Sequence, residues 1–289
     1  MPEQRGPNFV CIGAQKAGTT WLYKNLESHP DVWLTPVKEL HYFDRVSANE
    51  ALLGEWGMLH PEGVYNRYIK DQFPPSLKNM RWLRRYYRYG LDKQWYLGLF
   101  EEQFTGGQTC GDITPAYSTL DDSGVRYAQK VLGQDTAIIF IIRNPVERSW
   151  SAAKMMFRDQ DKSYERDNYA EITALLKKPL TVLRSDYANI IRRWQDHFQH
   201  VHVMTYDALC ESPDGFLGDI SRHLKIRNQW DRETINKRVW SDEKSSPVPD
   251  GIASLLRAQY QEQTEELYSL TGLPEVKQWL SDMSADQTT

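Results

Sequence analysis

Residues 136–142 form the longest apolar run of the chain, with the sequence Thr-Ala-Ile-Ile-Phe-Ile-Ile. The run lacks the polar alternation of a strand that has one face in water, so it predicts a strand covered on both faces. Such strands belong to parallel sheets that lie between two layers of helices. The run therefore predicts an α/β fold with residues 136–142 as its central strand.

Shorter apolar runs and amphipathic segments alternate around this strand. Residues 9–12 are apolar and stop at Gly13, which indicates a buried strand entering a tight turn. The next segment carries an apolar stripe and ends at His29-Pro30, because the residue before a proline avoids helical geometry. The expected elements are strands 9–12, 32–34, 136–142 and 201–204, and helices 19–28, 145–157, 187–198, 213–224 and 252–270. This alternation predicts a parallel α/β sheet flanked by helices.

Length and composition favour one domain. The 289 residues are 40% hydrophobic and 26% charged, which is enough to bury a full α/β core. We expect a single domain over 1–289, with an aromatic and basic insertion at about 44–108 lying over the active site. The polar residues 281–289 are expected to form a flexible tail.

Charge and cysteine content exclude several classes of protein. The net charge of −4 disfavours nucleic-acid binding, which needs a basic face to displace counterions from phosphates. Cys11, Cys110 and Cys210 lie far apart in sequence, without the pairing of a disulfide framework or a zinc site. The chain has neither an apolar run of about 18 residues nor a basic-then-apolar leader before Pro7, so we expect a cytoplasmic protein without a membrane segment. Nothing in the sequence indicates the oligomeric state.

The segment 13–20, Gly-Ala-Gln-Lys-Ala-Gly-Thr-Thr, connects the first expected strand to the first expected helix. Its backbone N–H groups and the helix dipole form a cradle for an anion. The glycine spacing is that of the loop G-x-x-x-x-G-K-[ST], but Thr19 stands where that loop has its lysine. An ATP loop needs that lysine on the β and γ phosphates, so the shift to Lys16 favours a donor without a γ phosphate, such as a phosphosulfate. A turn whose glycines only tighten the bend is the alternative.

A second anion site is expected after the central strand. Arg143 emerges at the carboxyl edge of the sheet, where open α/β folds bind ligands. Asn144 can cap the next helix and Pro145 can begin it, and Ser151 lies two turns further on. Arg143 and Ser151 are expected to hold a phosphate in charge-assisted hydrogen bonds, whereas Arg148 is expected to brace the helix through a salt bridge.

These two segments together resemble a known family. The loop 15–21, Gln-Lys-Ala-Gly-Thr-Thr-Trp, and the segment 143–151, Arg-Asn-Pro-Val-Glu-Arg-Ser-Trp-Ser, look like the 5′-phosphosulfate and 3′-phosphate motifs of sulfotransferases that use 3′-phosphoadenosine 5′-phosphosulfate (PAPS). The chain is most similar to the heparan sulfate sulfotransferase-like branch and its soluble bacterial relatives, through segments 38–44, 95–100, 114–117 and 187–209. The similarity spans residues 8 to about 225, with a weaker match at 272–279.

The resemblance implies a P-loop-like α/β fold, PAPS as the donor, 3′-phosphoadenosine 5′-phosphate (PAP) as the product and no required metal. The implied activity is transfer of a sulfuryl group to a hydroxyl or amine of a small-molecule acceptor, such as a natural product, or of a carbohydrate. The implied donor-binding residues are Lys16, Ala17, Gly18, Thr19, Thr20, Trp21, Arg143 and Ser151. The branch also has a lysine- and glycine-rich loop that closes on the 3′ phosphate, for which the candidates are Lys237, Arg238 and Lys244.

Sulfuryl transfer needs a cation at the leaving oxygen and a base at the acceptor proton. Lys16 is the expected cation. Glu39 and His41 are two residues apart, so an extended segment would point both to one face. Glu39 resembles the catalytic glutamate of the heparan sulfate branch, and other sulfotransferases use a histidine, so we assign Glu39 as the base with His41 as the alternative. Without the resemblance, an ordinary ion pair of Glu39 with Lys38 or with an arginine of the insertion would be the simpler interpretation.

Other interpretations of these residues remain open. An ATP-dependent small-molecule kinase of P-loop type would share the loop but need magnesium, and a non-catalytic nucleotide-binding scaffold would not need Glu39. Asp112 either reaches the acceptor or forms a turn before Thr114-Pro115. Segment 81–89 either recognises an anionic or flat acceptor or forms an amphipathic helix with its aromatics on the sheet. His197, His200 and His202 lack partners for a metal site, so a solvated loop is expected there.

Overall fold

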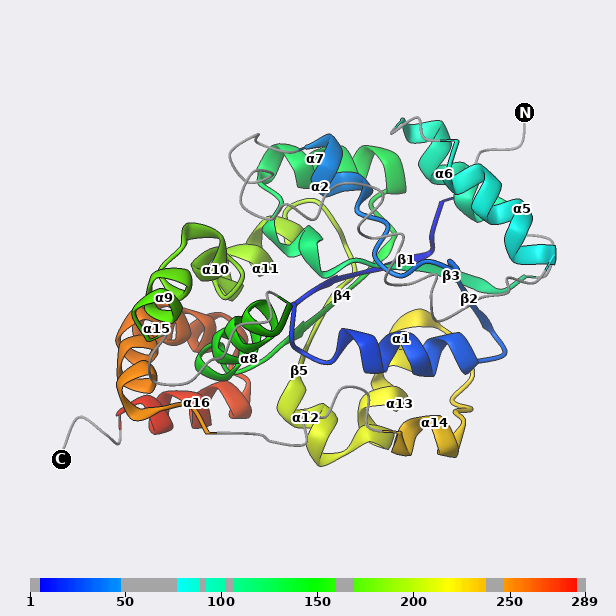
Figure 1. Ribbon diagram of the computed structural model, residues 1–289. Coiled ribbons are helices and arrows are strands. Elements are labelled where there is room, and N and C mark those ends of the chain that lie inside the picture. Colours follow the sequence, from blue (N-terminus) through cyan, green and yellow to red (C-terminus); the bar gives the residue numbers. More distant parts are fainter. Residues whose placement is uncertain are drawn as a thin grey trace.

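The computed structural model describes residues 6–47, 77–88, 92–101, 107–159, 169–237 and 247–284 (Figure 1). The strands are β1 (Phe9–Gly13), β2 (Val32–Leu34), β3 (Thr109–Ile113), β4 (Ala137–Ile142) and β5 (Val201–Thr205). The helices are α1 (Thr19–Ser28), α2 (Tyr42–Val46), α5 (Leu77–Tyr86), α6 (Lys93–Glu101), the 3₁₀ helix η3 (Pro115–Thr119), α7 (Asp122–Leu132), α8 (Pro145–Asp159), α9 (Tyr169–Leu176), α10 (Pro179–Leu183), α11 (Tyr187–Gln195), α12 (Tyr206–Glu211), α13 (Pro213–Leu224), α14 (Arg232–Asn236), α15 (Asp250–Thr271) and α16 (Pro274–Ser284).

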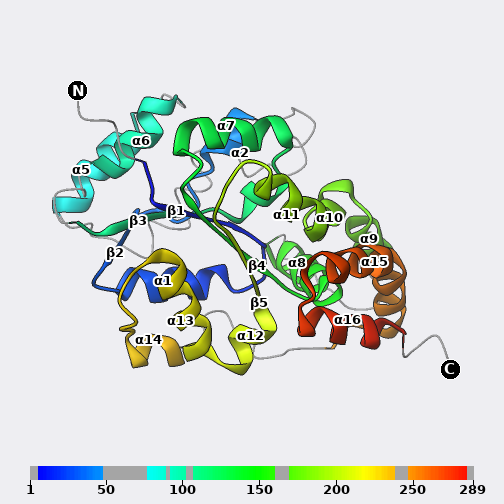
Figure 2. The same ribbon diagram turned by 180° about the vertical axis from the view of Figure 1, so that it is seen from behind.

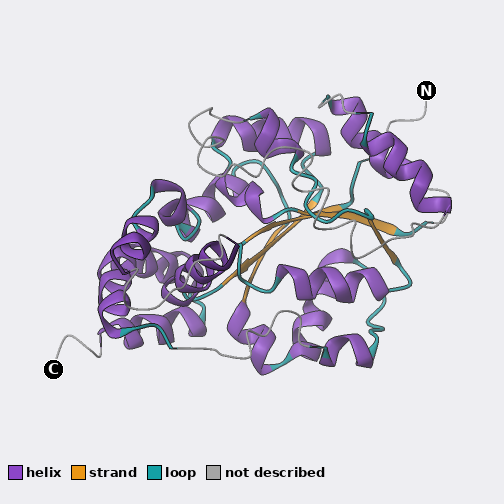
Figure 3. Cartoon of the chain, in the orientation of Figure 1, coloured by secondary structure: helices purple, strands orange, loops and turns teal. Residues whose placement is uncertain are grey.

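The strands form one parallel sheet that lies among the helices (Figure 3). The order of its five strands is β2-β3-β1-β4-β5. Residues 138–142 of β4 are fully buried, as the unbroken apolar run predicted. The middle position is taken by β1, however, with β4 between β1 and β5. Both strands are covered on both faces, so apolarity alone did not distinguish them.

Helices cover both faces of the sheet. Helices α1, α13 and α14 lie on one face, and α7 and α11 lie on the other, as the two opposite views agree (Figures 1 and 2). A second apolar cluster joins α8, α9 and α15 beyond the carboxyl end of β4. Leu256 and Tyr260 of α15 are fully buried in it. The predicted α/β fold with a parallel sheet flanked by helices is confirmed.

The described part of the expected insertion is helical. On α5, Trp82 donates through Nε1 to the carbonyl of Leu99 at 2.8 Å, and Trp95 of α6 donates to the carbonyl of Tyr86 at 3.2 Å. The two helices pack together near β2 and β3, at the other end of the sheet from α8 (Figure 1). Residues 48–76 of the expected insertion lie outside the described residues.

The C-terminal segment begins as a helix rather than as a tail. Helix α16 continues through Ser284, and Met283 is buried against the second cluster. Residues 281–284 are therefore not the start of a flexible tail, because an apolar side chain anchors this last turn. Residues 285–289 lie outside the described residues.

The ring of Phe9 in β1 packs directly against Gly111 in β3, and the two residues pair in the sheet register. A Cβ atom at position 111 would lie 1.9 Å from the Phe9 ring, which is fully buried. Gly111→Ala is therefore expected to lower the free energy of unfolding by about 1–3 kcal/mol through overpacking. Chemical denaturation measures this, with Gly251→Ala as the control, since no atom lies near the added methyl there. Equal stability of Gly111→Ala and the wild type would contradict the close approach.

Candidate active site

The loop between β1 and α1 bends sharply beside η3. Gly13 and Gly18 have positive φ values of 146° and 90°, which residues with a Cβ atom rarely adopt. A Cβ atom on Gly13 would lie 3.2 Å from the carbonyl oxygen of Pro115, and one on Gly18 would lie 3.2 Å from the side chain of Tyr206. The two glycines therefore allow the loop to pass between neighbouring segments. Lys16, between them, also has a left-handed backbone with φ 72°.

The first turn of α1 offers backbone N–H groups at the end of this loop. Gly18 is the N-cap and has no side chain with which to accept from them. Thr19 is buried and Thr20 is partly exposed. The indole of Trp21 instead packs edge-on against Phe216, and its Nε1 donates to the carbonyl of Ile235 at 3.2 Å. The indole of Trp21 is thus engaged within the protein. The donor-binding role predicted for Trp21 would therefore fall to its backbone N–H.

Arg143 connects the end of β4 to this loop. Its Nη1 donates to the carbonyl oxygen of Lys16 at 3.2 Å. Its Nε and Nη2 donate to Oε2 of Glu147 at 3.1 and 2.8 Å, and its Cζ lies 4.6 Å from the centre of the Tyr206 ring. The Tyr187 hydroxyl holds the Arg143 carbonyl at 2.8 Å. The two anion-binding segments predicted from the sequence therefore meet at this guanidinium.

The start of α8 is built as the sequence predicted. Oδ1 of Asn144 accepts from the backbone N–H of Val146 at 3.0 Å, which caps the helix. Ser151 lies four residues after Glu147 and so shares its face of α8. The two residues assigned to the second phosphate therefore flank the same side of the helix start.

Arg148 does not form the salt bridge that we expected. It is fully buried, and its hydrogen-bond acceptors within the described chain are the Ser185 hydroxyl at 2.6 Å, the Ser149 hydroxyl at 2.9 Å and the Thr181 carbonyl at 3.0 Å. Through these hydrogen bonds Arg148 connects α8 to α10, by way of Thr181, and to the turn before α11, by way of Ser185. Arg148 braces the helix, but through hydrogen bonds to neutral oxygens.

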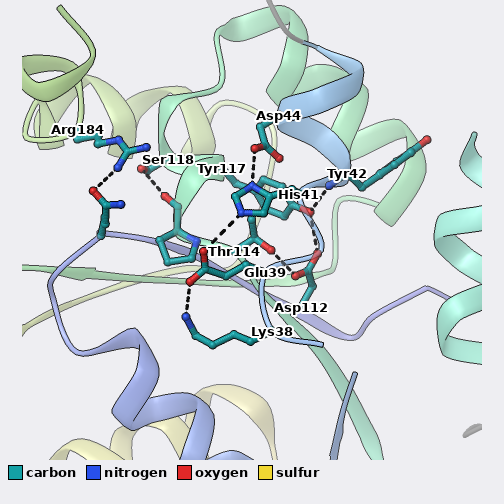
Figure 4. A network of polar contacts seen from close by, with 12 residues as sticks. Lys38, Glu39, His41, Tyr42, Asp44, Asp112, Thr114, Tyr117, Ser118 and Arg184 are labelled. Carbon is teal, nitrogen blue, oxygen red and sulfur yellow. Dashed lines mark hydrogen bonds and ion pairs between the residues drawn. The ribbon is translucent and has the colours of Figure 1, made fainter. Parts of the chain in front are cut away.

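Glu39 and His41 face each other across a short turn before α2 (Figure 4). Nε2 of His41 lies 3.5 Å from Oε2 of Glu39, and its Nδ1 lies 2.7 Å from Oδ2 of Asp44. The other carboxylate oxygen of Glu39 accepts from the ammonium of buried Lys38. The segment is not extended as expected, because Glu39 and His41 have φ values of 64° and 53°. The turn, rather than strand alternation, brings the two side chains together.

The charges in this cluster stabilise one another. Burial disfavours the ionised form of Glu39, but Lys38 and His41 outweigh burial and hold the pKa of its carboxyl well below the usual range. Burial also opposes charge on His41, but the carboxylates of Asp44 and Glu39 raise the pKa of its imidazole to about 10. At neutral pH Glu39 is therefore an anion and His41 is a cation.

The buried carboxylate of Asp112 lies beneath this cluster and accepts three hydrogen bonds. Asp112 is the second-to-last residue of β3, with 1% of its surface exposed, and it accepts from Thr114 at 2.7 Å and Tyr117 at 2.9 Å (Figure 4). It also accepts from the hydroxyl of Tyr96 at 3.0 Å. Burial raises the pKa of Asp112 to about 6, against the effect of these donors. The hydroxyl of Tyr117 also accepts from the backbone N–H of Tyr42, next to His41. Asp112 thus lies within β3 rather than in a turn, and its hydrogen bonds tie β3 to η3 and α6 beneath the cluster.

Arg184 contacts the loop between β1 and α1, and the sequence did not reveal this contact. Its Nη1 donates to Oε1 of Gln15, a residue 169 positions away in the chain (Figure 4). Burial and the nearby guanidinium of Arg148 lower the pKa of Arg184 to about 10, while the carboxylates of Glu39 and Asp44 act in the opposite direction. Arg184 thus contacts the loop directly and lies close enough to the Glu39 cluster for the carboxylates of Glu39 and Asp44 to act on its guanidinium.

Comparison with known proteins identifies the family. Residues 7–232 match the sequence profile described as the sulfotransferase family. The chain belongs to this family. The sulfotransferase is similar to the membrane-associated sulfotransferase kil1 of Dictyostelium discoideum, with 27% identity over 145 residues, which are 50% of this chain and 22% of that protein. The match therefore spans less than a quarter of the length of this curated relative.

Solved structures show the same fold as this sulfotransferase. A sulfotransferase from Alicyclobacillus acidocaldarius has a TM-score of 0.63 and 20% identity, and the match covers 94% of this chain and 98% of that one. The sulfotransferase domain of the Synechococcus PCC 7002 olefin synthase has a TM-score of 0.52 and 15% identity, with 89% and 90% of the two chains covered. The sulfotransferase domain from the curacin biosynthetic pathway has a TM-score of 0.52 and 14% identity, with 97% and 98% covered.

Segment 81–89 and three C-terminal basic residues were further candidates from the sequence of the sulfotransferase. On α5, Trp82 and Tyr86 are buried against α6 and Arg81 and Arg84 are exposed, as in the amphipathic alternative, although the aromatics pack on a helix rather than on the sheet. Lys237 pairs with Glu233 at 2.8 Å. Arg238 and Lys244 lie outside the described residues.

Among the described residues of the sulfotransferase, the histidines are not grouped for a metal. His197 contacts Asp122 at 2.9 Å, and His202, in β5 rather than in a loop, stacks on His223. Across the described ranges, no three His, Cys, Asp or Glu side chains are placed to hold a metal ion. None of the described helices is both long enough and apolar enough to cross a membrane.

Proposed function

We propose that this sulfotransferase moves a sulfuryl group from PAPS to a hydroxyl or amine of a small-molecule or carbohydrate acceptor. The observation that carries the proposal is the contact between Arg143 and the carbonyl of Lys16. The contact holds the two segments that we assign to anions side by side, as a donor with a 5′ phosphosulfate and a separate 3′ phosphate requires. A nucleotide with a single phosphate chain would need only the loop.

The donor set fits PAPS at both ends. The first N–H groups of α1 provide backbone donors and a positive helix end for the 5′ phosphate. In the turn before them, the N–H groups of Ala14 and Ala17 already donate to the carbonyls of Ile141 and Ala14. Thr19 and Thr20 are assigned to the same phosphate. Arg143 and Ser151 are assigned to the 3′ phosphate, next to the capped start of α8.

When bound, PAPS supplies an electrophilic sulfur and a phosphate leaving group. Lys16 is assigned to the negative charge that builds up on the leaving oxygen. Glu39 is assigned to the proton of the attacking hydroxyl or amine, because it is ionised and its carboxylate is held by Lys38 and His41. Protonated His41 cannot accept that proton, so we assign it to the orientation of Glu39 through its own contact with Asp44.

The charge of the chain bears on the acceptor. A long polyanion would call for an extended basic groove, whereas this chain has a net charge of −4. A small-molecule acceptor therefore fits better than a long anionic polysaccharide.

PAP is expected to stabilise the protein against heat in buffer that contains EDTA and no magnesium. A ligand that binds only the native state at about 100 times its Kd adds about 2.7 kcal/mol to the stability. Thermal unfolding with PAP, ATP and Mg-ATP tests this, and ATP should stabilise much less, because it lacks the 3′ phosphate that Arg143 would bind. Stabilisation by Mg-ATP with none by PAP would overturn the proposed donor and favour a kinase.

A further inference from the structure

Glu147 occupies one edge of the Arg143 guanidinium. Both Nε and Nη2 donate to the same oxygen of Glu147, at 3.1 and 2.8 Å. That edge is the fork with which arginine binds a phosphate through two parallel hydrogen bonds. The proposed function assigns the Arg143 guanidinium to a 3′ phosphate, and a carboxylate of the same chain holds its fork.

The two partners differ in how firmly they are held. Arg143 is also fixed by the carbonyl of Lys16 at its Nη1 and by the Tyr206 ring at its face, and its side chain is only 21% exposed. The side chain of Glu147 is 54% exposed, on the first turn of α8. Exposed ion pairs contribute little to stability, so Glu147 can turn into solvent at small cost. An incoming anion would therefore displace Glu147 and leave the guanidinium in place.

We propose that Glu147 is a displaceable counter-ion that competes with the 3′ phosphate for Arg143 and thereby weakens the binding of donor and product. The inference rests on the proposed function and adds a residue that tunes it. Binding of a 3′ phosphate must break the ion pair and bring a second anion close to Glu147, and both effects oppose binding. A nucleotide without a 3′ phosphate leaves the pair intact. The competition therefore acts on PAP and PAPS, and it eases the release of PAP after each turnover.

The test compares two nucleotides that differ only at the 3′ position. Isothermal titration calorimetry measures the Kd of PAP and of adenosine 5′-monophosphate for the wild type, Glu147→Gln and Glu147→Ala. Removal of an exposed competing charge is expected to tighten PAP binding about 2- to 5-fold in both variants. The affinity for adenosine 5′-monophosphate should not change.

Glu266→Gln is the matched control, because Glu266 forms a similarly exposed ion pair with Arg192 on other helices. It removes the same charge from the chain and should leave both affinities unchanged. PAP binding that is unchanged or weaker in the two Glu147 variants would overturn the inference, because Glu147 would then be neutral or would position Arg143 for phosphate. An equal gain for both nucleotides would also overturn it, since that gain would be a general charge effect. A wild-type protein that binds no PAP would overturn the proposed donor and the inference together.

Discussion

Glu39→Gln is expected to lower the turnover number about 10²- to 10⁴-fold while PAP still binds, because a positioned base typically contributes that much. Glutamine keeps the size and hydrogen-bonding capacity of the side chain and removes the basic oxygen. Lys38 and His41 hold the pKa of Glu39 below its usual range, which weakens the base and places the loss toward the lower end. Steady-state sulfation rates with a PAP titration on the same samples measure both effects.

His41→Asn is the control for this assignment. With its pKa raised to about 10, His41 is protonated at neutral pH and can orient Glu39 but cannot accept a proton. Its replacement should cost less turnover than Glu39→Gln. The pH profile gives a second check: since the pKa of Glu39 is depressed, the carboxylate stays ionised through the mildly acidic range and should cause no loss of activity there. An inactive His41→Asn beside a nearly fully active Glu39→Gln would make the histidine the base.

Arg143→Ala is expected to weaken PAP binding about 10- to 100-fold, since a hydrogen bond to a charged group contributes about 1.5–3 kcal/mol. The PAP affinity of Arg143→Lys should lie between those of the wild type and Arg143→Ala, because a lysine keeps the charge but lacks the forked pair of N–H donors. Ser151→Ala should cost less than either substitution. Arg192→Ala, at an exposed arginine paired with Glu266, is the control and should leave PAP binding unchanged.

Folding should survive Arg143→Ala, because the side chain lies at the edge of the site and is not part of the apolar core. Thermal unfolding without ligand checks this. A folded Arg143→Ala variant that binds PAP as tightly as the wild type would remove the second phosphate site from the proposed function.

Elements with a strong local pattern were predicted well. Helices α1 and α13 and strand β2 have the expected bounds. Gly18 and Pro30 flank α1, and Pro213 begins α13, so local sequence marks these boundaries. Strand β3 was not predicted, because Gly111 and Asp112 are residue types that strands disfavour. Packing of the Phe9 ring over Gly111 and burial of Asp112 beneath three hydroxyls stabilise that strand.

By itself, the sequence determined the parallel α/β fold, the glycine loop with Lys16 and the place of Arg143 after a buried strand, since each depends on neighbouring residues and their spacing. Only the tertiary structure decided which distant polar groups of the chain come into contact. The contact of Arg184 with Gln15 joins residues 169 positions apart, and that of Arg143 with the Lys16 carbonyl joins residues 127 apart. The left-handed turn at Glu39 and His41 is likewise held by Tyr117, whose hydroxyl binds the next backbone N–H from 75 residues away. Local spacing carries no information about such contacts, because they form only when the sheet brings the ends of separate strands to one edge.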